Sequence, residues 1–99
     1  KCDLAIEEDL DNVISIIKKD YNQFDAIINC AAIVAMEKIN EITYDKFSRA
    51  YKVNTIAPLY LFSALYDTIV QNEADILNIG TTASAPLKPG FSNQLAWVI

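Results

Sequence analysis

Two short apolar segments without polar–apolar alternation flank a long stretch of helical periodicity, and this order restricts the fold more than any other feature of the chain. Residues 25–32 read DAIINCAA, and the second segment contains Ile76, Leu77 and Ile79 before it stops at Gly80. Continuous apolar runs are typical of parallel strands whose two faces are covered by helices. We therefore predict strands at about 25–32 and 75–80.

A first helix is predicted at about residues 7–21. Apolar side chains recur there at the spacing of one helical face. Acidic residues fill the first turn, and Lys18 and Lys19 lie in the last, so that the charges complement the helix dipole.

A second helix is predicted at about residues 43–72, with Thr43 placed to cap it. The side chains that follow at steps of three or four are Phe47, Tyr51, Asn54, Pro58, Leu61, Leu65 and Ile69. Pro58 has no backbone N–H and is predicted to kink or divide the helix near Asn54. The order helix, strand, helix, strand predicts an α/β fold with parallel strands and right-handed crossovers.

Composition argues against several classes of function. Acids outnumber bases 13 to 8, and the formal charge of −5 is opposite to the electrostatic footprint of a nucleic-acid or anionic-membrane partner. The longest apolar stretch, residues 56–66, is shorter than the roughly 20 residues of a membrane helix. Histidine is absent and only Cys2 and Cys30 carry thiols. We expect no nucleic-acid, membrane or metal partner and a cytoplasmic protein with reduced cysteines.

Four segments, 2–4 (CDL), 29–32 (NCAA), 53–54 (VN) and 76–81 (ILNIGT), follow one another in an order and spacing that resemble the middle of a short-chain dehydrogenase/reductase. Members of that family are Rossmann-type oxidoreductases that use NAD or NADP. The resemblance implies a partial Rossmann-type doubly wound parallel sheet, with residues 1–99 as part of an NAD(P)-binding domain. It also implies hydride transfer between the nicotinamide cofactor and a carbonyl or alcohol substrate.

The resemblance places six residues beside the cofactor: Asp3, Leu4, Asn29, Ala31, Ala32 and Ile79. Asp3, with the backbone of Leu4, aligns with the acid near the adenine ring, where a carboxylate accepts from the exocyclic amine. Asn29, Ala31 and Ala32 match the segment that runs beside the ribose, where small residues let the backbone approach closely. The alternatives stay open that Asp3 is a solvated residue before a helix and that the two alanines only pack at a strand end.

The resemblance also implies two catalytic residues. Asn54 matches the asparagine that lies at a helix irregularity and holds a water of the proton relay. The alternative is that its amide bonds the carbonyl freed by Pro58. Thr81, which follows the cofactor-side residue Ile79, occupies the position of the catalytic serine, whose hydroxyl bonds the substrate carbonyl oxygen. Thr82 and Ser84 are alternates to Thr81, and hydroxyl residues are also common in turns after strands.

Two motifs of the family are missing. The Tyr-x-x-x-Lys motif would begin about 13 residues after Thr81, where Gln94 stands, and no tyrosine of the chain has a lysine four residues later. Only Gly80 and Gly90 are glycines, so a Gly-x-Gly-x-x-Gly phosphate loop is absent. We expect either a piece of a normal reductase or a degenerate homologue, and we expect the 99 residues alone to be inactive.

Two other functions compete with that of an oxidoreductase. One is a non-catalytic interaction or oligomerisation module, because aromatic residues occupy more than one face of the helix at 43–72. The other is sugar-nucleotide processing by the related extended reductases, which the Asn54 segment fits less well. A homo-oligomer through helix 43–72 is expected for the oxidoreductase and for the interaction module. The choice between NAD and NADP stays open.

Overall fold

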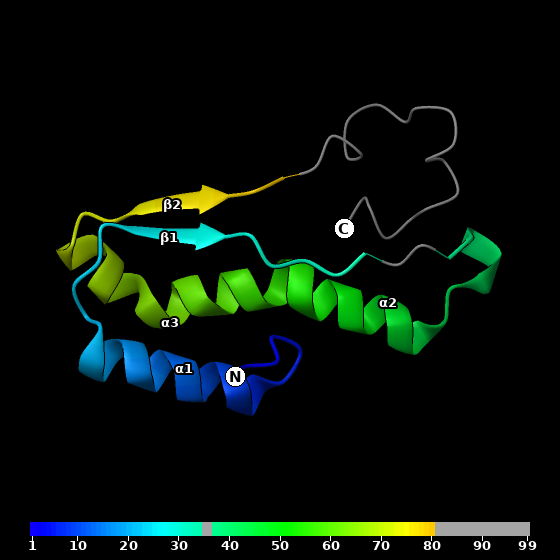
Figure 1. Ribbon diagram of the computed structural model, residues 1–99, viewed down its shortest axis with the longest axis horizontal. Helices are drawn as coiled ribbons and strands as arrows, with labels where there is room; N and C mark the ends of the chain where they lie inside the picture. Colours follow the sequence, from blue (N-terminus) through cyan, green and yellow to red (C-terminus); the bar gives the residue numbers. More distant parts are fainter. Residues whose placement is uncertain (35–36, 81–99) are drawn as a thin grey trace.

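The computed structural model describes residues 1–34 and 37–80 of the chain (Figure 1). In chain order, the elements are α1 (Glu7–Asp20), β1 (Ala26–Asn29), a 3-10 helix (Ile39–Glu41), α2 (Tyr44–Tyr51), a π-helix η2 (Lys52–Ile56), α3 (Ala57–Gln71) and β2 (Asp75–Asn78). Both strands lie within their predicted ranges, and the helices end within one residue of the predicted bounds. The 3-10 helix was not predicted.

The two strands pair in parallel, from Ala26 opposite Asp75 to Asn29 opposite Asn78, which confirms the predicted arrangement. β1 is shorter than predicted, because the strand ends at Asn29 and not at position 32. Beyond it, the N–H and C=O groups of Ile33 bond the side chain of Asn54 instead of a neighbouring strand. The helix at 44–71 thus replaces the sheet as the hydrogen-bond partner of this segment.

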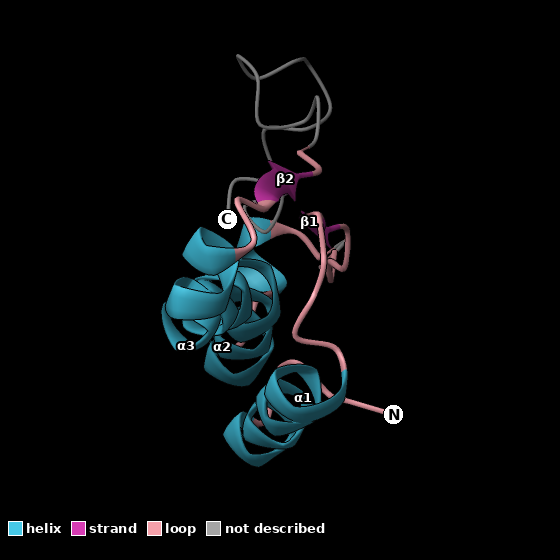
Figure 2. Cartoon of the chain, turned by 90° about the vertical axis from the view of Figure 1, so that its left-hand side faces the viewer, coloured by secondary structure: helices cyan, strands magenta, loops and turns pink. Residues whose placement is uncertain are grey.

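Helices α1 and α3 lie on the same side of the two-stranded sheet (Figures 1 and 2). Ile14 of α1 is buried with Leu65 and Ile69 of α3, and Ile27 of β1 packs against this cluster. The hydroxyl of Tyr60 also donates to Asp11, at 2.7 Å, and joins α3 to α1. Apolar burial between the helices and β1 is therefore the core of the described residues.

The long helical run is divided where Pro58 predicts a division. Thr43 caps α2, and its hydroxyl accepts from the N–H of Lys46 at 3.4 Å. The N–H of Ala57 reaches the carbonyl of Lys52, five residues back, so η2 is wound more widely than an α-helix. Pro58 lies in the first turn of α3, where a missing N–H costs little.

The buried face of the run differs from the predicted one in its first half. The buried residues are Ala50, Val53, Ala57, Leu65 and Ile69. Phe47 and Tyr51, which were predicted on this face, are 36% and 42% exposed, and their rings stack on each other with centroids 6.4 Å apart. Both sets recur at steps of three or four, so periodicity alone did not separate them. The small alanines are fully buried, whereas the aromatic rings remain partly exposed.

The described residues contain one helical run, Tyr44–Gln71, that is long and apolar enough to cross a membrane by length and composition. About a fifth of its most apolar window, 22%, is buried inside the protein. Core helices of soluble proteins meet the same criteria, and Leu65 and Ile69 of this run lie in the core described above. The run is therefore weak support for a membrane span.

The turn from α3 to β2 is held by backbone hydrogen bonds. The N–H of Ala74 donates to the carbonyl of Ile69, and that of Glu73 donates to Val70. This is the Schellman arrangement, which requires a left-handed residue at the position of Glu73. Glu73 has a φ of 51°, and the side chain of Asn72 donates to the carbonyl of Asn22 after α1. The amino ends of the two strands are thus fixed by a local turn before β2 and by one contact between residues 50 positions apart.

Candidate functional site

The carboxyl ends of β1 and β2 meet at one edge of the sheet. Asn29 and Asn78 form the last paired position of the two strands, and the amide of Asn29 donates to Asn78 at 2.8 Å. The N–H of Ile79 donates to the carbonyl of Asn29 at 2.9 Å, so the pairing continues one residue further. Ligands of open α/β sheets bind beyond this edge. Two residues of the predicted cofactor side, Asn29 and Ile79, are therefore brought together.

Asn54 lies in η2 and is half-buried beside the segment that follows β1. Its side-chain oxygen accepts from the N–H of Ile33, and its side-chain nitrogen donates to the carbonyl of Ile33, both at 2.8 Å. The amide therefore bonds a segment 21 residues away and not the carbonyl that Pro58 frees. This pair of bonds fixes the end of segment 30–33, which includes Ala31 and Ala32, against the helix.

Ala31 and Ala32 are exposed in the segment between β1 and Ile33. Neither side chain extends beyond Cβ, so the backbone there is open to close approach by a ligand. Thr81, with its alternates Thr82 and Ser84, lies outside the described residues. The structure therefore places one of the two predicted catalytic residues.

Asp3 lies in a turn before α1 and is bound on both carboxylate oxygens. The N–H of Ala5 donates to Oδ1 at 3.0 Å, and Arg49 of α2 donates to Oδ2 at 2.9 Å. The hydrogen bond from Ala5, followed by that from Arg49, holds the pKa of the Asp3 carboxyl below its usual value. Asp3 is thus joined to α2, the helix that leads directly into η2 and Asn54.

The sequence reasoning missed two side chains that contact predicted site residues. Asn78 could have been found by the argument that singled out Asn29, because each is an amide in a short apolar strand that requires a partner. Arg49 had no comparable signal, because its contact with Asp3 joins residues 46 positions apart and depends on how α2 lies in the fold.

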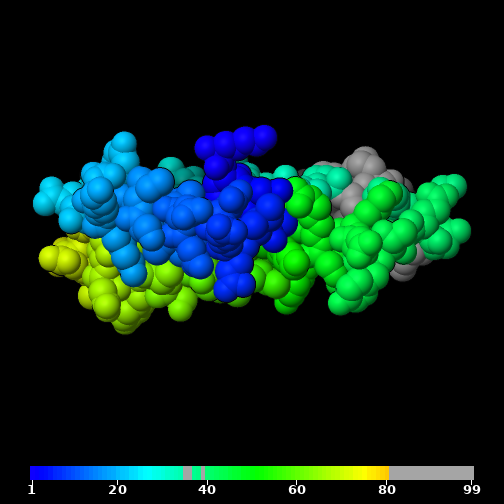
Figure 3. All heavy atoms as spheres, turned by 90° about the horizontal axis from the view of Figure 1, so that it is seen from below, coloured from blue at the N-terminus to red at the C-terminus, as the bar shows by residue number. Residues whose placement is uncertain are grey.

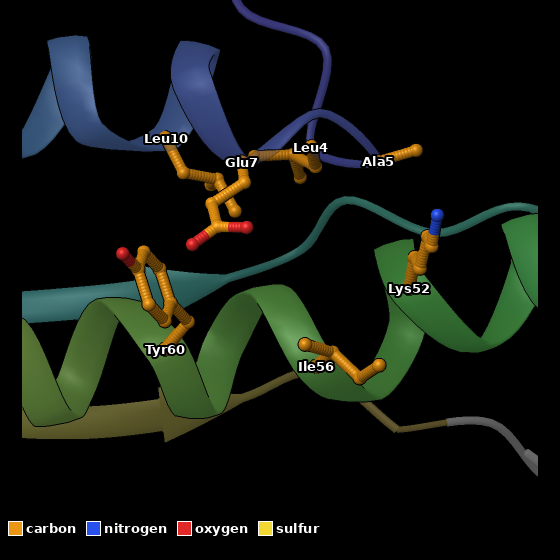
Figure 4. A pocket seen from close by; sticks show the side chains of 7 residues that line it. All are labelled: Leu4, Ala5, Glu7, Leu10, Lys52, Ile56 and Tyr60. Atoms are coloured by element: carbon orange, nitrogen blue, oxygen red, sulfur yellow. The ribbon is translucent and has the colours of Figure 1, made fainter.

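A pocket of about 350 Å³ lies between the beginning of α1 and the helical run η2–α3 (Figure 4). The lining residues are Leu4, Ala5, Glu7, Leu10, Lys52, Ile56 and Tyr60. Leu4 is the one predicted site residue among them. The hydrogen bond to Asp11 raises the pKa of Tyr60, which keeps this hydroxyl protonated and unsuited to exchange a proton near neutral pH.

Within residues 1–34 and 37–80, no cluster of three or more acidic, cysteine or histidine side chains could hold a metal ion. Cys2 and Cys30 are both free thiols.

Residues 1–93 match the protein family described as short chain dehydrogenase. A galactitol 2-dehydrogenase from Agrobacterium fabrum is 25% identical over 84% of the chain. A short chain dehydrogenase family protein from Francisella tularensis has the same fold, with a TM-score of 0.81, 26% identity and 98% of this chain covered. A 4-hydroxyisoleucine dehydrogenase complexed with NADH and succinate has a TM-score of 0.80, 22% identity and 97% of this chain covered.

The chain spans only part of the length of these proteins. It covers 33% of the galactitol 2-dehydrogenase and 44% of a second curated relative, a short-chain dehydrogenase/reductase from Penicillium canescens. It covers 38% and 45% of the two solved structures named above. The family match over residues 1–93 spans every residue that the structure describes. The match over 93 residues, together with this partial Rossmann-type α/β fold, means that the chain belongs to the short chain dehydrogenase family.

Proposed function

We propose that the chain forms part of the NAD(P) site of an oxidoreductase that transfers a hydride between the nicotinamide cofactor and a carbonyl or alcohol substrate. The observation that carries the proposal is Asn54, which lies in a π-helix and bonds Ile33 just beyond the carboxyl end of β1. π-helices are rare and occur frequently at functional sites. The 99 residues alone are proposed to be inactive, and the complete protein is proposed to be a cytoplasmic enzyme.

The donors and acceptors of the predicted site residues fit a dinucleotide. Asp3 offers a carboxylate to the adenine amine, Asn29 lies at the strand end, and Ala31 and Ala32 leave the backbone open on the ribose side. The solved structure complexed with NADH shares this fold, which supports NAD or NADP as the cofactor. When bound, the nicotinamide ring donates or accepts the hydride, and the chain's own residues orient it.

Asn54 is proposed to hold the relay water through its main-chain carbonyl. Both polar atoms of its side chain already bond Ile33, so the side chain serves to fix the segment after β1. Pro58 has no N–H and cannot give the Asn54 carbonyl the hydrogen bond that it would receive in an α-helix. Thr81 is proposed to donate its hydroxyl to the substrate carbonyl oxygen as negative charge develops.

A non-catalytic interaction module remains the second candidate, because α3 exposes an apolar face. Leu59, Tyr66 and Val70 are 62%, 65% and 57% exposed and lie on one face of the helix, at steps of seven and four. A second copy of the chain packed on this face would bury it. We therefore propose a homo-oligomer through the helix at 44–71, whether or not the protein is an enzyme.

The test uses the protein expressed from its complete reading frame. Binding of NADH and NADPH is followed by fluorescence, and hydride transfer is measured with a panel of ketones and secondary alcohols. Asn54→Ala removes both bonds to Ile33 and so loosens the placement of the carbonyl at position 54. It is expected to lower kcat by about a hundredfold, the size of a lost proton-transfer contribution.

Asn72→Ala is the matched control, because it removes a side-chain-to-carbonyl bond at the other end of the same helical run. It is expected to leave kcat within about twofold. A protein that binds neither cofactor contradicts the proposal, as do equal losses of kcat in the two variants. Gel filtration of Tyr66→Asp tests the oligomer, for which a shift to a smaller species is expected.

A further inference from the structure

The contact between Arg49 and Asp3 joins two segments that are far apart in the sequence. The guanidinium of Arg49 in α2 donates to Oδ2 of Asp3 at 2.9 Å, and the N–H of Ala5 donates to the other carboxylate oxygen. The N–H of Asp3 itself donates to the carboxylate of Asp9 in α1 at 2.7 Å. Hydrogen bonds with Asp9, Ala5 and Arg49 therefore orient both the main chain and the side chain of Asp3.

The exposure of this pair indicates that its role is not mainly to stabilise the fold. The side chains of Arg49 and Asp3 are 53% and 33% exposed. Ion pairs at such positions contribute little to the free energy of unfolding. They do, however, restrict rotamers, and a restricted side chain loses less conformational entropy when a ligand binds it.

We propose that Arg49 is a positioning residue that holds the Asp3 carboxylate in the orientation in which it accepts a hydrogen bond from the adenine end of the cofactor. This inference rests on the proposed function, which places the adenine ring at Asp3. The planar guanidinium has five N–H donors, and the bond to Asp3 uses one of them. Lysine offers a more flexible point charge and is expected to replace Arg49 only in part.

The chain contains a matched control on the same helix. Lys46, one turn before Arg49, donates to Glu37 at 2.6 Å, and its side chain is also 53% exposed. Glu37 is not among the residues that the site brings to the cofactor. In both contacts a cation of α2, 53% exposed, bonds a carboxylate. The contacts differ in which carboxylate is bound, Glu37 or Asp3.

The experiment compares Arg49→Met, Arg49→Lys and Lys46→Met in the protein from the complete reading frame. NADH and NADPH dissociation constants are measured by fluorescence titration, and thermal denaturation verifies folding. Arg49→Met is expected to raise the dissociation constant about tenfold, the size of one hydrogen bond to a charged group, with kcat at saturating cofactor within about twofold. Arg49→Lys is expected to recover part of the loss, and Lys46→Met to stay within about twofold of the wild type.

A second readout follows the Asp3 carboxyl itself by NMR titration. Loss of the Arg49 bond is expected to raise the pKa of Asp3 only partly toward its ordinary value, because the Ala5 N–H and the charge of Lys1 still lower it. Asp9, whose carboxylate bonds the N–H of Asp3, is retained in all variants. Lys46→Met is expected to leave the titration of Asp3 unchanged.

Two results overturn the inference while leaving the proposed function intact. They are unchanged cofactor affinity in Arg49→Met, whether or not kcat falls, and equal weakening of cofactor binding in Lys46→Met. If Arg49→Met does not fold, Asp3→Asn replaces it, and a dissociation constant that stays at the wild-type value rejects the inference. A folded wild-type protein that binds neither NADH nor NADPH rejects the proposed function and, with it, this inference.

Discussion

Two regions of the molecule differ in the balance of apolar packing and hydrogen bonds that joins them to neighbouring segments. In the α1–α3 region, Leu10 and Ile14 of one helix and Leu65 and Ile69 of the other are buried. In the α2–η2 region, residues 44–56, Ala50 and Val53 are also buried, but side chains of this region reach other segments through hydrogen bonds. These bonds join Lys46 to Glu37, Arg49 to Asp3 and Asn54 to Ile33, and the last two hold predicted site residues. Figure 3 shows α1 lying over α3 and stopping short of α2.

This difference indicates that the contacts that stabilise the fold are not the ones that set the positions of the site residues. Apolar packing contributes most of the free energy of folding but is not directional, so it tolerates some change of shape. Hydrogen bonds contribute less net free energy, but each fixes a distance and an angle. The described site residues are held by the second kind of contact, attached to a scaffold that is stabilised by the first.

The largest change in the free energy of unfolding is expected from a substitution in the α1–α3 region. Leu65 is 2% exposed, and Leu65→Ala is expected to lower the free energy of unfolding by about 3 kcal/mol, because it leaves a cavity in the core. Thermal or urea denaturation measures this loss. Gln71→Ala, on the same helix but exposed and away from the apolar face of Leu59, Tyr66 and Val70, is expected to change it by less than about 0.5 kcal/mol. Similar losses in both variants would mean that α3 is packed differently.

The next largest effect is expected in the α2–η2 region. Asn54→Leu leaves the N–H and C=O of Ile33 without their partner and is expected to cost about 2 kcal/mol. The loss should be local: hydrogen exchange is expected to speed up at Ile33 and in η2 before it does so in α3. Uniform acceleration over α3 as well would contradict the division into two regions.

A smaller effect of opposite sign is expected at the end of the α1–α3 region. Glu73 has a φ of 51°, a conformation that glycine adopts without strain. Glu73→Gly is expected to raise the free energy of unfolding by about 0.5–1 kcal/mol. The matched variant Asn72→Gly, at a φ of −86°, should lower it. Urea denaturation of the two variants measures both changes. A lower free energy of unfolding in Glu73→Gly would contradict the left-handed conformation of Glu73 in the turn from α3 to β2.

The smallest effect is expected from acid. Asp3 has a pKa lowered chiefly by the Ala5 N–H and then by Arg49, and Glu37 has a pKa lowered chiefly by Lys46. A carboxylate with a lowered pKa stabilises the fold at pH values above its ordinary pKa, and this contribution is lost as the pH falls through the lowered value. Amide NMR spectra recorded from pH 6 downward are expected to change in α2 below about pH 4, before they change in α3. Simultaneous changes in both helices would show that these ion pairs do not act locally.

The sequence predicted the elements better than their contacts. Thr43 and Pro58 act through the backbone next to them, so the cap of α2 and the division near Asn54 could be predicted. The partner of Asn54 could not, because Ile33 offers only its main-chain groups, which every residue carries. Periodicity likewise could not distinguish the face of Ala50 from that of Phe47, since both sets have helical spacing.

The π-helix sets the rotation of α2 relative to α3. η2 accommodates about one residue more per turn than the α-helices on either side of it. If the same residues wound as regular α-helix, α2 would turn by about 100° relative to α3. Lys46 and Arg49 would then point away from Glu37 and Asp3. A change that converts η2 to regular α-helix at unchanged length would therefore disconnect the polar contacts of α2 while leaving the buried cluster of α1 and α3 in place.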